Sequence, residues 1–346
     1  MEKIKVLIAG IGGASLGTEI FKCLKLAGVY EIYGCDISNY AFGHYMQGFK
    51  ETFVVQKENY IEQVLELCRK KSIEVIVPGA EETTVILGLN RGIFEREGIK
   101  VACNSENVIK ICSSKHSLFS KLSELGIKCP KTLLVENLDR DISALDDFPF
   151  PCVIKPSEGS GGSVFTFLAK NKKEAMLFIE YLLSNSIRPV VQEYIPESEG
   201  EFTIGVLSGK DKKIIGSIVM KRLYPSKLSV KLKTDYGIIS SGYSQGYFAD
   251  FEDVREQAEK ISLSLMSEGP MNIQGRLKDG FFLPFEINPR FSASVYARAL
   301  AGFNEVHLFI EHLYGKISGR YDFDVKKGLF LRSFTEVFVG EDKIKE

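Results

Sequence analysis

The sequence predicts an α/β fold that becomes α+β in its C-terminal half, in a chain of 346 residues. Two observations predict it. Over residues 4–110, short apolar runs alternate with helical patterns, which indicates a parallel sheet wound with helices. After Arg188, β-type runs follow one another across short polar turns, which is typical of antiparallel strands. The length is sufficient for two or three domains with their own cores.

The composition is that of an ordinary globular protein, with 45% hydrophobic and 26% charged residues and a formal net charge of −1. This balance argues against a nucleic-acid binder that works by neutralising phosphates. No apolar stretch approaches the roughly 20 residues that a membrane span needs. Seven scattered cysteines without a C-x-x-C pair indicate free thiols in a reducing compartment. We therefore expect a cytoplasmic protein that binds neither nucleic acid nor membrane.

The N-terminal part contains four predicted buried strands, at residues 4–10, 30–36, 74–79 and 99–104. Ligands of such parallel sheets lie at the carboxyl ends of the strands, where this chain carries a glycine-rich turn and Asp36. The turn begins as a dinucleotide fingerprint, but Ser15 stands where the third glycine is required. An NAD-dependent oxidoreductase is thus the weaker interpretation of this turn.

A helix is predicted over residues 115–125, with Ser114 as its N-cap and Gly126 as its stop signal. The strand "CVIKP" that follows later contains Lys155, and a lysine inside an apolar strand is costly without a partner. Directly after it comes "SEGSGGSVF", whose glycines allow a row of backbone N–H groups to cradle phosphate. The alternative is a hairpin tip with an exposed lysine head. The pattern is not a P-loop, because the lysine precedes the glycines.

A second candidate site lies in "FEINPRFS", where Glu286, Asn288 and Arg290 alternate and so share one face of a strand. Two oxygen ligands beside an arginine suit Mg²⁺ that bridges phosphates. The alternative is an edge strand whose polar face is only solvated. Gln274 joins this face if the turn between the strands is a three-residue loop over residues 278–280, and we expect that loop. A two-residue turn would place Gln274 on the opposite face.

A third candidate site lies in "VVQEYIPESEGEFTIGVL", where two β-type runs flank a polar loop. Free backbone groups at a strand end can hydrogen-bond an adenine edge, and a carboxylate can accept from ribose hydroxyls. Glu193 and Glu201 are the carboxylates in reach of such a ligand. An ordinary surface turn is the alternative.

The order and content of these three segments resemble the ATP-grasp superfamily, in particular its carbamoyl-phosphate-synthase-like carboxylate–amine ligases. The resemblance covers nearly the whole chain, and "FEINPRFS" is its most specific element. The N-terminal "AGIGGASLG" is similar to the Rossmann-like domain that precedes the ATP-grasp fold and does not hold the nucleotide. The implied domains are residues 1–112 for that domain, 113–189 for a small lid subdomain and 190–340 for the C-terminal subdomain.

The resemblance also implies roles for individual residues. Those implied for ATP are Lys115, Lys155, Ser160, Gly161 and Gly162 on the phosphates, Glu193, Tyr194 and Ile195 at the adenine, and Glu201 at the ribose. The implied ligands of Mg²⁺ or Mn²⁺ are Gln274, Glu286 and Asn288, of which Gln274 replaces the acidic residue of many relatives. The implied catalytic residues are Arg290, Lys155 and Arg222.

The implied activity is an ATP- and Mg²⁺-dependent ligation of a small-molecule carboxylate to an amine through an acyl phosphate. Glu81 and Glu82 are candidates for binding the amine, and Lys221 for binding phosphate or the acid. A homodimer is common among relatives. Two alternatives stay open: a bicarbonate-using or carbamoyl-phosphate-type enzyme, and a non-catalytic ATP-binding regulator. Residues 340–346 are expected to be a solvated tail.

Overall fold

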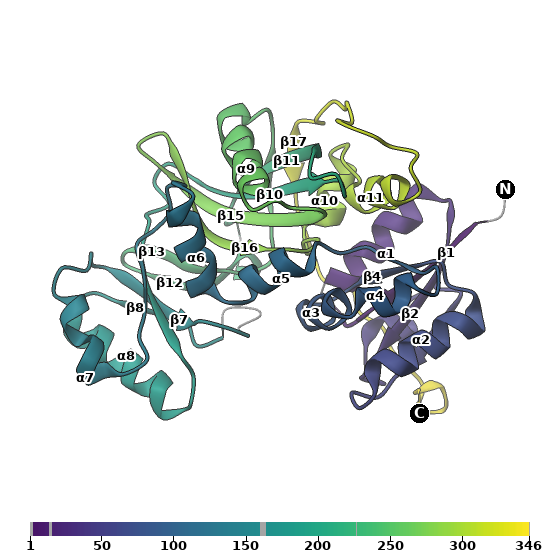
Figure 1. The fold of residues 1–346 in the computed structure, drawn as a ribbon, viewed down its shortest axis with the longest axis horizontal. Helices are drawn as coiled ribbons and strands as arrows, with labels where there is room; N and C mark the ends of the chain where they lie inside the picture. Colours follow the sequence, from purple (N-terminus) through teal and green to yellow (C-terminus); the bar gives the residue numbers. More distant parts are fainter. Residues whose placement is uncertain (1–2, 14–15, 160–163, 226, 346) are drawn as a thin grey trace.

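The computed structural model describes residues 3–13, 16–159, 164–225 and 227–345. In Figure 1 a five-stranded sheet with its helices forms the right-hand part of the molecule, and three antiparallel sheets, of six, four and two strands, lie in the rest. The mixed α/β fold, with its antiparallel C-terminal half, agrees with the prediction. No helix of the described residues is long and apolar enough to cross a bilayer.

The N-terminal sheet has the order β3-β2-β1-β4-β5, and all its pairings are parallel, as the alternating pattern predicts. Its strands are β1 (Ile4–Ala9), β2 (Tyr30–Asp36), β3 (Glu51–Val54), β4 (Val75–Pro78) and β5 (Lys100–Val101). Its helices are α1 (Leu16–Ala27), the 3₁₀ helix η1 (Phe42–Tyr45), α2 (Tyr60–Lys71), α3 (Glu81–Leu89) and α4 (Arg91–Glu95). The strand order reverses between β1 and β4, and the crevice of such a sheet opens at that point.

The glycine-rich turn after β1 is a packing device. A Cβ atom on Gly17 would lie 1.8 Å from the carbonyl oxygen of Gly10, and one on Gly79 would lie 2.0 Å from it. Only glycine therefore allows α1 and the loop after β4 to approach the turn this closely. The Asp36 Oδ2 atom accepts a hydrogen bond from the Ile11 amide at 2.7 Å. The carboxylate that would meet the ribose of a dinucleotide thus closes the turn instead.

An antiparallel four-stranded sheet follows, in the order β6-β9-β7-β8. Its strands are β6 (Thr132–Leu134), β7 (Cys152–Pro156), β8 (Phe167–Ala169) and β9 (Pro189–Glu193), and its helices are α7 (Leu138–Asp141), η2 (Ile142–Leu145) and α8 (Lys172–Ser184). Before it come α5 (Glu106–Ser113) and α6 (Lys115–Glu124). Ser114 caps α6 through a hydrogen bond from the Ser117 amide, as predicted. Because β9 belongs to this sheet, the sheet continues past residue 189, where the sequence suggests a domain boundary.

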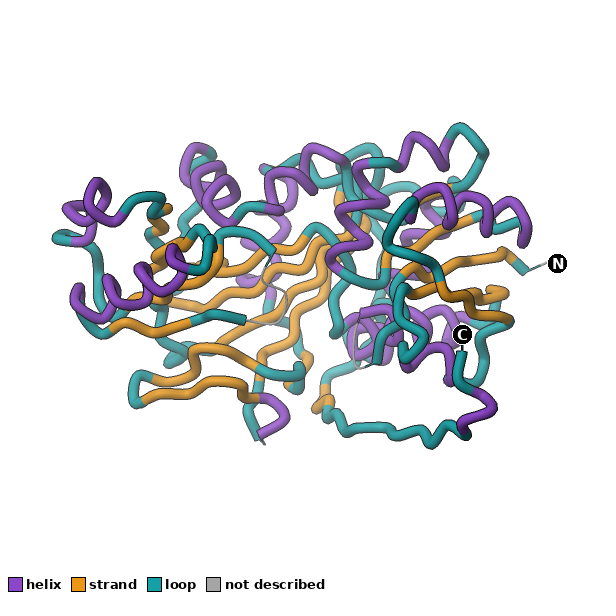
Figure 2. The backbone as a smooth tube through the Cα atoms, turned by 90° about the horizontal axis from the view of Figure 1, so that it is seen from below, coloured by secondary structure: helices purple, strands orange, loops and turns teal. Residues whose placement is uncertain are grey.

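The third sheet has six strands in the order β16-β15-β10-β11-β14-β17. They are β10 (Glu201–Ser208), β11 (Ile214–Arg222), β14 (Gly246–Phe248), β15 (Pro270–Lys278), β16 (Phe281–Asn288) and β17 (Gly328–Phe330). The remaining elements are η4 (Lys227–Ser229), the hairpin of β12 (Val230–Thr234) and β13 (Gly237–Ser241), and the helices α9 (Glu252–Ser264), α10 (Val295–Leu300) and α11 (Glu305–Leu313). In Figure 2 the strands of the four-stranded and six-stranded sheets lie beside one another.

One continuous core joins the two halves of the molecule. Apolar residues of α10 and α11 pack both against α1 and against the six-stranded sheet, as in the cluster that contains Ile20, Met220 and Phe309. On the opposite face of the six-stranded sheet, α6 and α9 pack together over Ile204 and Ile273. The two halves therefore bury apolar surface against each other. This contact holds the parallel sheet beside the six-stranded sheet.

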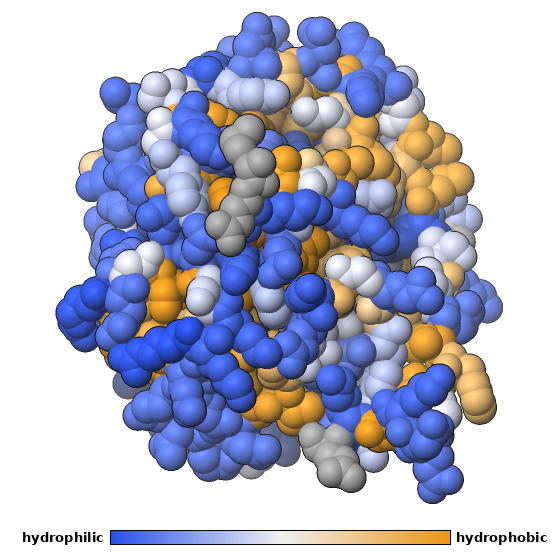
Figure 3. Space-filling view, turned by 90° about the vertical axis from the view of Figure 1, so that its right-hand side faces the viewer, coloured by the Kyte–Doolittle hydropathy of each residue, from blue (hydrophilic) through white to orange (hydrophobic). Residues whose placement is uncertain are grey.

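The C-terminal segment returns to the first domain, as Figure 1 shows. The Lys345 amide donates to the Tyr45 hydroxyl at 3.1 Å, its Nζ atom donates to the Thr52 carbonyl, and its own carbonyl accepts from Asn39. Residues 341–344 are exposed, as expected of a solvated tail, whereas Lys345 is half-buried and held by these bonds. Polar side chains tie this segment down, and it runs past η5 (Glu341–Lys343). Figure 3 looks onto this end of the molecule, whose surface is mainly hydrophilic with apolar residues gathered along one side.

Candidate functional site

The hairpin of β15 and β16 carries the predicted metal ligands, and its geometry corrects one prediction. Lys278 pairs with Phe281, and both Asp279 and Gly280 have positive φ, so the turn has two residues rather than three. The expected three-residue loop is wrong. A bulge further along the hairpin has the same effect on the register.

The bulge lies at Phe285, because Gly275 pairs with Pro284 while Gln274 pairs with Glu286. Proline cannot donate to a ladder, and bulges are one of the places where sheets accept it. The extra residue inverts the alternation, so Gln274 and Glu286 face each other across the two strands after all. The predicted shared face is right, for a reason that the prediction did not contain.

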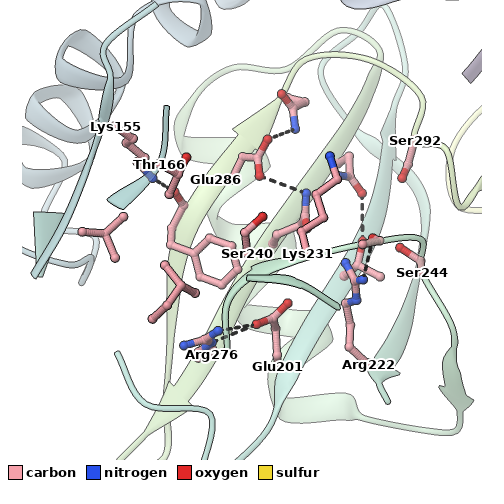
Figure 4. Close-up of a pocket in the computed structure, with 18 of the residues that line it drawn as sticks. Lys155, Thr166, Glu201, Arg222, Lys231, Ser240, Ser244, Arg276, Glu286 and Ser292 are labelled. Carbon is pink, nitrogen blue, oxygen red and sulfur yellow. Dashed lines mark hydrogen bonds and ion pairs between the residues drawn. The ribbon is translucent and has the colours of Figure 1, made fainter. Parts of the chain in front are cut away.

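Glu286 lies between two side-chain amides at this face. Its Oε2 atom accepts from Gln274 at 3.2 Å and its Oε1 atom accepts from Asn288 at 3.1 Å, as the dashed lines from Glu286 in Figure 4 show. One carboxylate and two amides together supply the oxygen donors that Mg²⁺ prefers. The described residues contain no group of three or more His, Cys, Asp or Glu side chains that could hold a metal.

Lys155 is a half-buried lysine opposite this face. Its Nζ atom donates to Gln192 Oε1 at 2.7 Å and to the Phe285 carbonyl at 3.1 Å, and both acceptors are neutral. Burial, and secondly the charge of Lys115, lower the pKa of Lys155 to about 7, against the opposing effect of Glu286. An anion that entered the site would stabilise the charged form.

Nucleotide affinity is expected to fall as the pH is raised from about 7 to about 9. In the free protein Lys155 loses its proton above a pKa of about 7, whereas a bound phosphate favours the charged lysine, so binding above that pH requires proton uptake. Calorimetric titration with Mg·ADP should show the fall in the wild-type protein and little of it in Lys155→Arg. Lys110→Arg, at an exposed lysine, is the matched control. Equal slopes in the wild type and Lys155→Arg would contradict this role.

Lys115 begins α6 and lines the same cavity. Burial lowers its pKa, while the charges of Glu286, Glu81 and Glu158 oppose this shift. Its amide donates to the Ser157 carbonyl at 2.8 Å, which fixes the start of α6 beside the end of β7. The remaining predicted phosphate ligands, Ser160, Gly161 and Gly162, lie outside the described residues.

The segment after β9 forms another wall of the cavity. Glu193 accepts from the Lys131 amide at 3.2 Å and from Lys278 at 3.3 Å, so its carboxylate is engaged. Burial raises the pKa of Tyr194 to about 12, and its hydroxyl donates to the Tyr236 carbonyl at 3.0 Å. The carbonyl of Ile195 accepts from Arg276. All three of the predicted adenine contacts line the cavity.

Glu201 is the first residue of β10 and lies directly across from Arg276 of β15. Its Oε2 atom accepts from Arg276 Nε at 2.9 Å and from Nη2 at 2.7 Å, and both side chains are buried. Its Oε1 atom is buried and accepts no hydrogen bond from the described residues. The nearby Tyr224 hydroxyl has a raised pKa, from burial first and then from the charge of Glu201. The Tyr224 hydroxyl interacts with this carboxylate, so Glu201 faces both Arg276 and Tyr224.

Two predicted arginines reach the cavity with part of their hydrogen-bonding capacity unused. Arg290 donates to Glu81 Oε2 at 3.3 Å and to the Phe291 carbonyl at 3.0 Å. Arg222 donates to the Gly242 carbonyl at 3.1 Å. The Nε atom of each is buried and has no partner among the described residues. Glu82 and Lys221, by contrast, are not among the described residues that line the cavity.

These groups surround one cavity of about 420 Å³, lined by the four-stranded sheet, the six-stranded sheet and the hairpin of β12 and β13. Figure 4 shows Lys155 and Glu286 on one side of it, with Arg222 and the pair of Arg276 and Glu201 on the others. Its described lining includes three carboxylates, Glu193, Glu201 and Glu286. It also includes seven cations, Lys115, Lys155, Arg222, Lys231, Arg276, Arg290 and Arg332. Arg276, Arg290 and Arg332 are paired with Glu201, Glu81 and Glu19. The other basic side chains still outnumber the other carboxylates in this partly desolvated space, which favours a polyanion.

Sequence reasoning missed Arg276, Lys231 and Arg332. Arg276 could have been found, because it alternates with Gln274 on the same strand and so shares its face. No pattern marked Arg332, which comes from the returning C-terminal segment and joins the site only through the tertiary fold.

A buried ion pair lies behind the cavity wall that contains Asn272 and Thr203. Arg298 of α10 donates to Glu305 at 2.9 Å, and neither side chain is exposed. The same guanidinium donates to Asn272 at 2.6 Å and to Thr203 at 3.1 Å, and both of these residues line the cavity. Burial raises the pKa of Glu305, and the charge of Arg298 lowers it. The pair therefore holds two polar groups of the site in fixed positions.

A family model described as ATP-grasp domain matches residues 112–294, more than half of the chain. The large chain of carbamoyl phosphate synthase from Vibrio cholerae is 25% identical over 237 residues, which is 68% of this chain and 21% of that protein. The arginine-specific mitochondrial large chain from Neurospora crassa is 25% identical over 306 residues, 84% of this chain and 25% of that one. The chain thus spans about a fifth to a quarter of the length of these relatives.

Solved structures share the fold over almost the whole chain. An L-amino acid ligase from Bacillus licheniformis has a TM-score of 0.68 at 15% identity, covering 92% of this chain and 77% of its own. N5-carboxyaminoimidazole synthetase from Staphylococcus aureus, complexed with ADP, has a TM-score of 0.68 at 16% identity, covering 94% and 81%. The chain therefore belongs to the ATP-grasp family, and the predictions of the family, of the fold class and of an ATP-dependent enzyme are confirmed.

Proposed function

We propose that this chain is an ATP- and Mg²⁺-dependent carboxylate–amine ligase whose ATP binds in the large cavity. The observation that carries the proposal is that seven basic side chains line the same cavity as Glu286, Gln274 and Asn288. A nucleoside triphosphate supplies the negative charge that this cavity lacks. Glu201, which lines the cavity beside Arg276, is the carboxylate that would accept from a ribose hydroxyl.

The donor set fits a divalent cation. Glu286 and the amide oxygens of Gln274 and Asn288 would hold Mg²⁺, which when bound neutralises charge on the phosphates. Lys155 and Lys115 would position the phosphates and neutralise their charge. Arg290 and Arg222 would do the same for the oxygens of the transferred group. The backbone at residues 193–195 would receive the adenine.

The reaction proceeds in two steps, phosphorylation of the acid and attack of the amine. An oxygen of the acid carboxylate forms a bond to the γ-phosphorus, the bond from that phosphorus to the bridging oxygen breaks, and ADP leaves. The amine nitrogen then attacks the acyl carbon, the bond from carbon to the phosphate oxygen breaks, inorganic phosphate leaves, and the amine loses a proton to solvent. The site has to exclude water between the two steps, because water would hydrolyse the acyl phosphate.

The test is ADP release from Mg·ATP across a matrix of carboxylic acids and amines, with mass spectrometry of the products. We expect ADP only with certain pairs of acid and amine, together with a product lighter by one water than their sum. Release with bicarbonate alone would favour the bicarbonate-using alternative. Nucleotide binding in the cavity without release for any acid would contradict the ligase.

Metal binding is expected to depend on the nucleotide. Glu286 supplies the only carboxylate of the proposed set, so Mn²⁺ alone should bind weakly, and ADP should tighten its binding at least tenfold by adding phosphate oxygens. Electron paramagnetic resonance of Mn²⁺ with and without ADP measures this directly. Equal affinity in both conditions would show that the protein holds the metal without phosphate, against this assignment.

A further inference from the structure

A second cavity, of about 160 Å³, adjoins the first. It lies between α1, the segment that contains η1, and the returning C-terminal segment. Arg332 and Tyr243 line both cavities. A ligand in the second cavity therefore lies next to the first cavity.

The polar end of this cavity is cationic. Glu19 is buried and accepts from Lys22 at 2.7 Å and from Arg332 at 3.0 Å, so two cations share one carboxylate. Arg332 also donates to the Ala293 carbonyl at 2.8 Å, and its Nε atom is buried without a partner among the described residues. The surplus positive charge lies where the two cavities meet, and it favours an anionic group there.

The rest of the lining is mostly apolar, with Thr18, Ser333 and Thr335 as its polar members. Its walls include Phe42, Met46, Leu228, Tyr243 and Phe334. The rings of Tyr243 and Phe334 meet edge to face, with centroids 5.9 Å apart. A cavity of roughly 150 Å³ lined by apolar side chains holds a benzene ring, so this one has room for a body of that size.

We infer that the acid substrate is a small carboxylic acid with one apolar body of about the size of a phenyl ring. Its carboxylate lies beside Arg332, facing the phosphates, and its apolar body fills the second cavity. This inference rests on the proposed function, because it assigns the acid of that reaction. It also assigns a specificity role to a C-terminal segment that lies outside the matched ATP-grasp domain.

The test is calorimetric binding of acetate, isovalerate and 3-phenylpropionate to the full chain loaded with Mg·ADP. Affinity is expected to rise at least tenfold from acetate to 3-phenylpropionate, because the larger acid buries more apolar surface. Met46→Trp, which fills the cavity, should remove this preference and leave acetate binding unchanged. Arg332→Gln should weaken the binding of all three acids about tenfold or more, through the loss of a charge-assisted bond.

The C-terminal segment offers a matched pair of variants. Phe334→Ala should weaken 3-phenylpropionate several-fold, whereas Phe338→Ala should change nothing, because Phe338 is 97% exposed and lines neither cavity. Thermal melting establishes that each variant is folded. Equal affinity of the wild-type protein for the three acids, or a preference that survives in Met46→Trp, would overturn the inference.

The experiments distinguish a failure of this inference from a failure of the proposed function. Selective acid binding without acid-dependent ADP release would keep the second cavity as an acid site and reject the ligase. ADP release that is equally fast with acids of every size would keep the ligase and reject this assignment.

Discussion

Replacing both Glu286 and Asn288 by alanine is expected to slow acid-dependent ADP release by about 1,000-fold or more. The double variant removes the carboxylate and one amide of the proposed Mg²⁺ site, and a metal that neutralises phosphate charge contributes several kcal/mol to such a reaction. Steady-state kinetics with saturating Mg·ATP measures the effect. Wild-type activity in the double variant would refute the assignment of the metal face.

Two further variants separate a ligand role from a structural one. Asn288→Asp keeps an oxygen ligand and should retain more activity than Asn288→Ala, with a changed dependence on Mg²⁺ concentration. Glu252→Ala is the matched control, since Glu252 lies on the surface of α9 with its side chain 70% exposed. It should leave both the rate and the Mg²⁺ dependence unchanged.

Arg298→Met is expected to lower the free energy of unfolding by about 3–5 kcal/mol, because it leaves the buried Glu305 without its cation. Neither side chain of the pair is exposed, so solvent cannot compensate for the loss. Denaturant unfolding at neutral pH measures it. A loss below about 1 kcal/mol, the range of exposed ion pairs, would contradict this account of the pair.

The pH dependence of that loss has a definite sign. The pKa of Glu305 is raised in the folded protein, so the folded state binds more protons than the unfolded state and its stability falls as the pH rises. Without Arg298 the pKa should rise further, and Arg298→Met should be less destabilised at about pH 5 than at about pH 8. Adding Glu305→Leu should restore much of the lost stability. Arg320→Met, at a half-exposed ion pair with Glu259, is the control and should cost less than about 1 kcal/mol.

The sequence predicts the fold class well, because period-2 and helical patterns report local burial directly. The short strand β3 was not predicted, since its four residues are too few to show a period. The shared face of Gln274 and Glu286 was predicted correctly on wrong grounds. Pro284 was the available signal, because a proline inside a strand pattern indicates a bulge or an edge.

Other features of the site depend on tertiary structure alone. Arg332 enters the site from a segment with no motif, and Glu19 of α1 meets it across 313 positions of sequence. The ion pair of Arg290 and Glu81 likewise joins two domains. The predicted domain boundaries and the homodimer stay predictions, as do the roles of the individual site residues.

The central claim is that a carboxylate oxygen attacks the γ-phosphate of ATP. It is tested most directly by supplying a substrate acid labelled with ¹⁸O in its carboxylate, together with Mg·ATP and the amine, and by analysing the inorganic phosphate released. An acyl phosphate predicts that one ¹⁸O atom passes from the acid to phosphate for each amide formed. Amide formation with unlabelled phosphate would contradict this account.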